Sequence, residues 1–341
     1  MKLLKLAVIL TLLQATLFAK EDKTTILLHH FNSPSSPTHT KLLLPWAKSL
    51  EEKSGGKIKV EIFPSMSMGG KPSELYRQVV DGSADVIWTL AGYTPGVFTR
   101  TEVFELPTVH LNSSVATNLA IKDNFKDIEE DFKNVKPLLV HVHAGNAIHT
   151  VDNKVDKVSD LKGLKLRTPS RTGAWFISEI GAEPVSMPLP DLPQALSQKA
   201  IDGGLIPFEV FPPFKLHQLT NYSIQGPNSQ RFGTSVLLLL MNKKKYDNLS
   251  KELQEIIDES MNIDMVKQAG EIWMDIETPG ITLQKDKKEG GIIELDAQSI
   301  KDFNAAGEAV VSKWIKEVEA KGIDGKSLVE KARKSIEANS K

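Results

Sequence analysis

The stretch "GLKLRTPSRTGAWFISEIGAEPVSM", residues 163–187, contains a complete strand–helix–strand unit. The alternating "LKLRT" near its start predicts a strand, and "RTGAWFISEI" has the spacing of an amphipathic helix that stops at Gly181. The segment "AEPVSM" then predicts a second strand. Strands that alternate with helices are typical of α/β folds with parallel sheets.

The same order recurs on both sides of this stretch. Downstream, we expect a helix over 189–203 and a strand over 203–208. Upstream, the pattern predicts three strands and two helices, namely strands at 24–31, 57–63 and 84–90 and helices at 40–53 and 73–82. Two β-α-β-α-β sets in one chain predict two lobes.

The remaining segments connect and cover these lobes. The apolar run 232–242 predicts a strand that returns to the first lobe. From Ser250 to about Glu277, apolar residues recur at helical spacing, which predicts one helix of about 40 Å that spans both lobes. Residues 297–338 predict two more amphipathic helices. We therefore expect a first lobe of residues 20–144 with 233–272, and a second of 145–232 with 273–341.

The N-terminus predicts export. Lys2 and Lys5 precede an apolar run, and Ala19 offers a small residue before the charged "KEDKT". The run is too short to cross a bilayer, so residues 1–19 are interpreted as a secretory signal peptide that directs the chain to the periplasm. The chain has no cysteine, which excludes disulfides, thiolate metal sites and a cysteine-linked lipid anchor.

Composition and motifs argue against several classes of function. The 341 residues hold 42 basic and 43 acidic side chains, so we expect no binding to nucleic acid. Sequence motifs for a nucleophile elbow, a phosphate-binding loop and a zinc helix are missing. His141 and His143 would share one strand face, but no third metal ligand is predictable, so we interpret them as core residues. We expect no enzyme activity, no cofactor and no metal.

Two arginines suggest an anion site. Arg167 ends a short strand that is turned by Pro169, and open α/β sheets bind ligands outside the carboxyl ends of their strands. A guanidinium at that place can hold a carboxylate through two hydrogen bonds. The alternative is a structural salt bridge to an acid such as Asp160. Arg171 lies four residues further on and is expected to contact the same anion or a neighbouring oxygen.

Other candidate ligand contacts also lie near the predicted strand ends. Together they suggest an apolar pocket with a few polar groups, as is usual for small-molecule sites. The expected apolar walls are Trp88, Tyr93, Phe208 and Phe211, and the expected polar contacts are Glu209, Asn146 and His30. Glu209 has an alternative role, which is to hold one of the two arginines in place.

Several motifs resemble the substrate-binding proteins of tripartite ATP-independent periplasmic (TRAP) transporters of the dicarboxylate-binding type. They include "DGSADVIWTLAGYTPGVFTRTEVFELP", "DLKGLKLRTP", "GAEPVSMPLPDLPQALSQKAIDG" and "YDNLSKELQEIID", and the resemblance covers nearly the whole chain after the signal peptide. It implies two α/β lobes joined by hinge strands, with a long helix along both.

The resemblance also implies a function. Arg167 matches the signature arginine that pairs with the ligand carboxylate, and ligand is delivered to a sodium-driven membrane transporter. Ala147 and Ile206 stand where the acidic-sugar binders of the family carry arginine and asparagine, so a smaller or more apolar carboxylate is expected. Aromatic acids, 2-oxo or 2-hydroxy acids and short dicarboxylates all fit this expectation. We expect a monomeric receptor that closes on its ligand. The alternatives are an exported enzyme on the same scaffold and a receptor that feeds a signalling protein.

Overall fold

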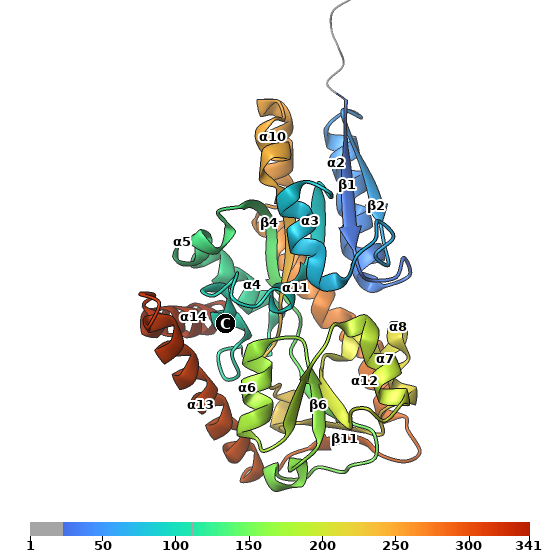
Figure 1. The fold of residues 1–341 in the computed structure, drawn as a ribbon, viewed down its shortest axis with the longest axis vertical. Coiled ribbons are helices and arrows are strands. Elements are labelled where there is room, and N and C mark those ends of the chain that lie inside the picture. The colour runs from blue at the N-terminus through green and yellow to red at the C-terminus, as the bar shows by residue number, and fades with distance from the viewer. Residues whose placement is uncertain (1–22, 111) are drawn as a thin grey trace, which may run out of the picture.

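The computed structural model describes residues 23–110 and 112–341, so the signal peptide expected at 1–19 lies outside the described residues. Two mixed β-sheets with helices around them form two lobes, one above the other in Figure 1. This arrangement confirms the two-lobed α/β fold. Among the described helices, none has the length and apolar character needed to cross a membrane.

The first sheet has the strand order β2-β1-β3-β10-β4. Its central strands β3 and β10 are largely apolar and are buried along their whole length, as is typical of strands with helices on both faces. The return of the run 232–242 to this lobe is confirmed, since β10 pairs antiparallel to both β3 and β4. The strands are β1 (Thr24–His30), β2 (Ile58–Phe63), β3 (Val86–Leu90), β4 (Val135–Val142) and β10 (Val236–Asn242).

The second sheet has the order β11-β9-β5-β8-β6-β7. Residues 163–187 form β6, α6 and β7, with β6 parallel to β7 and β8. The sheet is mixed rather than wholly parallel, because β5 runs antiparallel to β8 and β9. The strands are β5 (Ala147–Thr150), β6 (Lys165–Thr168), β7 (Glu183–Ser186), β8 (Gly203–Ile206), β9 (Tyr222–Gln225) and β11 (Gly291–Glu294).

Short helices connect and cover the strands. Pro45 is the second residue of α2 and directly follows a π-helical turn over Thr38–Leu43, so the helical segment continues through the proline with a local change in its turn. The helices up to residue 247 are α2 (Leu44–Lys53), α3 (Leu75–Asp81), α4 (Ser114–Asp123), α5 (Phe125–Ile128), α6 (Arg171–Glu179), α7 (Leu192–Ser197), α8 (Phe211–Phe214) and α9 (Lys243–Asp247).

The continuous helix expected from Ser250 to about Glu277 is wrong. The segment forms α10 (Lys251–Ser260), α11 (Ile263–Asp275) and α12 (Glu277–Lys285). Asn262 starts α11, because its side chain accepts hydrogen bonds from two backbone N–H groups of the first turn. The three helices still run from the first lobe, where α10 contacts α2, to the second, where α12 contacts α8.

A different long helix contacts both lobes. The helix α13 (Ser299–Glu319) packs on α6 of the second lobe, and Gly307 lies against Pro107 and Thr108, which follow β3 of the first lobe. The last helix, α14 (Gly325–Asn339), packs on α4 beside the first sheet, as Figure 1 shows. All described strands of each sheet fall within the lobe bounds expected for it; the bounds themselves stay a prediction.

The chain crosses between the lobes after β4 and again before β10. The two crossing segments hydrogen-bond to each other, since the Asn146 N–H donates to Gly233 O at 2.8 Å and the Phe232 N–H donates to Asn146 O at 2.8 Å. The Thr234 hydroxyl also donates to His143 O at 2.8 Å. These paired segments are the hinge between the lobes.

Candidate functional site

A cavity lies between the two lobes. It is bordered by the carboxyl ends of β1, β3, β6 and β8 and by the hinge, which is where α/β sheets bind ligands. Its apolar walls include Phe31, Trp88, Leu189, Leu237, Trp273 and Ile276. Its polar lining includes Asn32, Thr38, His143, Asn146, Arg167 and Glu209.

Arg167 is the only arginine in the described lining of this cavity, and it is only 2% exposed. Its Nε donates to Met187 O at 3.0 Å and its Nη1 reaches Leu205 O at 3.5 Å, whereas Nη2 has no partner. Burial lowers the pKa of Arg167, opposed by Tyr93 and Asp191. A buried cation without an ion-pair partner is costly, so this guanidinium is arranged to receive an anion.

The alternative salt bridge to Asp160 is not formed. The Asp160 carboxylate instead accepts the backbone N–H groups of Asp156 and Lys157 at 3.0 and 3.1 Å. Gly204 on β8 allows the close approach of Arg167, since a Cβ there would lie 3.0 Å from Arg167 O. The strand pairing of β6 with β8 therefore fixes the arginine at the cavity.

Trp88 forms one wall of the cavity and is held in place from behind. Its Nε1 donates to His141 Nε2 at 3.3 Å, and its ring stacks on Trp273 with a centroid distance of 6.2 Å. Burial lowers the pKa of His141 to about 3, so the imidazole is neutral and can accept this hydrogen bond. Phe31 also packs against Trp88, with a centroid distance of 5.4 Å. The result is a rigid aromatic wall.

Asn146 and Glu209 line the cavity with oxygen atoms that lack a partner, Asn146 Oδ1 and Glu209 Oε2. Burial raises the pKa of Glu209 well above its usual value, and the charge of Glu277 adds to this shift. Glu277 is itself paired with Arg231 at 2.9 Å. Glu209 does not hold Arg171, whose carboxylate partners are other residues.

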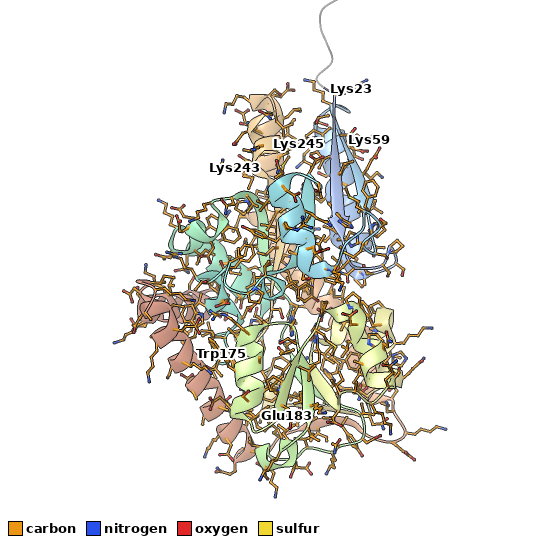
Figure 2. All side chains as sticks on the ribbon, in the orientation of Figure 1. Lys23, Lys59, Trp175, Glu183, Lys243 and Lys245 are labelled. Carbon is orange, nitrogen blue, oxygen red and sulfur yellow. The ribbon has the colours of Figure 1, made fainter. Side chains whose placement is uncertain are left out.

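Arg171 does not line the cavity. Its guanidinium is bound by both oxygens of Glu102, at 2.6 and 2.5 Å, and by Glu317. It also lies over the ring of Trp175 at 4.9 Å, on the side of α6 that faces α13 in Figure 2. Its positive charge is therefore neutralised within the protein.

The other candidates also lie behind the lining. Tyr93 is buried next to Arg167, and its hydroxyl accepts the Leu189 N–H at 2.8 Å. Phe208 and Phe211 pack on His149 in the core of the second lobe, with centroid distances of 4.9 and 4.5 Å. His30 Nε2 hydrogen-bonds to His39 Nδ1 at 3.0 Å. Of the nine candidates, the structure brings Arg167, Trp88, Asn146 and Glu209 together at the cavity.

Sequence reasoning missed Phe31, Thr38 and Trp273. Phe31 directly follows the end of β1. The rule that ligands bind at the carboxyl ends of strands, which pointed to His30, therefore also applied to Phe31. Trp273 lines the cavity from the last turn of α11, and Pro279 in the first turn of α12 was a signal for a new helix start. Among the described residues, no group of three or more His, Asp or Glu side chains is placed to hold a metal ion.

Comparisons with known proteins agree with this geometry. Residues 28–317 match the model of the bacterial extracellular solute-binding proteins, family 7. A marine-metagenome TRAP solute-binding protein specific for aromatic acid ligands is 38% identical, with a TM-score of 0.90 over 94% of this chain and 100% of that one, in complex with metahydroxyphenylacetate. The same protein was also crystallised with 3-hydroxybenzoate.

Two further relatives are similar. A TRAP solute-binding protein from Rhodoferax ferrireducens in complex with benzoate is 34% identical, with a TM-score of 0.89 over 93% of this chain and 99% of that one. The 2,3-diketo-L-gulonate-binding periplasmic protein of Escherichia coli is 25% identical over 61% of this chain and 63% of its own. The family and these relatives are binding proteins rather than enzymes. The chain belongs to family 7 of the bacterial extracellular solute-binding proteins and is a TRAP solute-binding protein.

Proposed function

We propose that this protein captures a small aromatic monocarboxylate in the periplasm and delivers it, as a monomer, to the membrane subunits of a sodium-driven TRAP transporter. Arg167 binds the ligand carboxylate. Trp88 and the rings beside it contact the flat face of the ligand, and Asn146 and Glu209 contact its polar substituents. Closure of the two lobes about the hinge buries the ligand.

The observation that carries this proposal is the buried Arg167 Nη2, which has no partner and lies in a cavity with aromatic walls. One positive group suits one carboxylate. Each charge-assisted hydrogen bond contributes about 1.5–3 kcal/mol, a large share of the roughly 8 kcal/mol of micromolar binding. The aromatic acids bound by the 38% and 34% identical relatives support the same ligand class.

Isothermal titration calorimetry tests the proposal. We expect benzoate or a substituted benzoate to bind at about micromolar or better, and more tightly than a short dicarboxylate or a sugar acid. Arg167→Ala is expected to weaken that binding by about a hundredfold or more, because two charge-assisted bonds are lost. Arg77→Ala is the matched control, since that arginine is 68% exposed on α3, far from the lining.

Two results would overturn the proposal. One is equal affinity of wild type and Arg167→Ala for the aromatic acid. The other is a clear preference of the wild-type protein for a sugar acid or a dicarboxylate.

A further inference from the structure

Besides Arg167, two polar residues of the cavity lining have an oxygen without a partner. Glu209 Oε2 and Asn146 Oδ1 are both buried, both in the lining and both without a partner. Glu209 follows β8, and Asn146 belongs to the hinge. A carboxylate can only accept hydrogen bonds, so an unsubstituted aromatic acid bound to Arg167 supplies no donor to these oxygens.

The surroundings of Glu209 define which group it can receive. Glu277 lies close enough for its negative charge to act on Glu209, and Glu277 takes up the charge of Arg231 and the Phe208 N–H. Two carboxyl groups therefore share one arginine. Trp273 lines the same cavity as Glu209, and no lysine lines it within the described residues.

The protonation state of Glu209 follows from this arrangement. Burial, reinforced by Glu277, raises the pKa of Glu209 well above its usual range, opposed by Arg231 and Trp273. A shift in this direction favours the neutral carboxylic acid, which can donate one hydrogen bond and accept others. A hydroxyl group on the ligand can likewise donate one hydrogen bond and accept others, so it can pair with this carboxylic acid. A second carboxylate on the ligand would be buried here without a cation to match it.

We propose that Glu209 is a specificity-determining residue that recognises a hydroxyl group on the ligand, with Asn146 as the second partner, so that the preferred ligands are hydroxylated aromatic acids. This inference rests on the proposed function, because it needs the carboxylate on Arg167 to orient the ring. The carboxylate and the hydroxyl then lie at two separate polar regions, and the aromatic walls fix the plane of the ring between them.

Calorimetry with benzoate, the three monohydroxybenzoates and benzene-1,3-dicarboxylate tests the inference. For wild type, we expect at least one hydroxybenzoate to bind about tenfold or more tightly than benzoate, since a buried hydrogen-bonded hydroxyl discriminates strongly against an analogue that lacks it. The dicarboxylate is expected to bind more weakly than benzoate.

Two substitutions at one position separate recognition from packing. Glu209→Gln keeps a donor and an acceptor in the same shape and should retain the preference for the hydroxybenzoate to within about threefold. Glu209→Leu removes both and should abolish the preference, through a loss of about tenfold for the hydroxybenzoate and little change for benzoate. Thermal denaturation of both variants checks that they are folded.

The outcomes for the two proposals are distinct. If wild type binds benzoate and the hydroxybenzoates equally, the proposed function stands and this inference is overturned. It is also overturned if Glu209→Leu weakens benzoate and hydroxybenzoate to the same extent. If no aromatic acid binds, both proposals fail. The comparison of benzoate with the hydroxybenzoates uses the wild-type protein alone. It can therefore overturn the inference even if one of the variants does not fold.

Discussion

At the scale of single residues, burial decides which charged groups the lobes can hold. Arg167 keeps its charge at 2% exposure because backbone carbonyls accept two of its donors. Glu105, at 3% exposure, instead favours its neutral form, because burial raises its pKa to about 8 and the charge of Glu102 adds to this shift. Both groups lie in the contact region between the lobes, where few waters can solvate a charge.

Glu105 predicts a decline of stability with rising pH. The ordinary pKa of a glutamate side chain is 4.5. Between pH 4.5 and about 8, Glu105 therefore holds a proton in the folded protein that it releases in the unfolded chain. The free energy of unfolding therefore falls as pH rises through this window, by up to about 1.4 kcal/mol per pH unit. Glu105→Gln mimics the protonated acid and keeps an acceptor for the Val236 N–H, which Glu105 Oε1 binds at 2.9 Å.

Chemical denaturation at pH 6 and pH 8 measures this effect. Between the two values, wild type should lose about 1–3 kcal/mol more than Glu105→Gln, since all other titrating groups are common to both proteins. Arg171 and Thr172 face Glu105 from α6 and are unchanged in the variant. An identical decline in both proteins would show that Glu105 is ionised in the folded state.

At the scale of elements, the Arg171 cluster joins three separate parts of the chain. Arg171 starts α6, Glu317 belongs to α13, and Glu102 belongs to a 3-10 helix over Thr101–Glu105. The Trp314 Nε1 also donates to Glu102 Oε2 at 3.1 Å. The cluster thus ties the second lobe to α13 and to the segment after β3.

Arg171→Ala is predicted to affect stability but not ligand recognition. It leaves two partly buried carboxylates without their partner, so the free energy of unfolding should fall by about 1–3 kcal/mol, a range discounted for the 20% exposure of Arg171. The affinity of the folded protein for an aromatic acid should change by no more than about threefold. A loss of binding as large as that of Arg167→Ala would instead place Arg171 in the site.

At the scale of the whole molecule, the two lobes approach each other closely beside the cavity. Gly92, just after β3, packs against Pro169 and Ser170 just after β6. A Cβ at Gly92 would lie 2.8 Å from Pro169 O and 2.7 Å from Ser170 Cβ. A backbone carbonyl cannot rotate out of the way, so the two lobes would have to separate slightly.

Gly92→Ala is therefore expected to favour the open form. Gly92 does not have a positive φ, so alanine fits the local backbone and the thermal midpoint without ligand should change little. Affinity for the ligand should fall about tenfold or more, because closing the lobes would press the added Cβ against Pro169 and Ser170. Small-angle scattering with saturating ligand should show a larger radius of gyration than wild type. Pro95→Ala, exposed in the same loop, is the control. Unchanged affinity would mean that the contact does not limit closure.

The sequence by itself determined the two α/β lobes, the return of β10 to the first sheet and the place of Arg167 near the carboxyl end of a short strand. These depend on periodicity and on strand ends, which are local properties. The break of the expected helix at Asn262 was also a local signal, because asparagine is a strong helix N-cap.

Only the tertiary structure decided the fate of the two arginines. Both stand on one strand–helix unit, but Arg167 points into a cavity and keeps an unpaired Nη2, whereas Arg171 meets Glu102 and Glu317, 69 and 146 residues away. The same holds for the aromatic candidates, of which Trp88 lines the cavity and Phe208 and Phe211 fill the core. Charge neutralisation and burial depend on residues brought together from distant parts of the chain, and no local pattern encodes them.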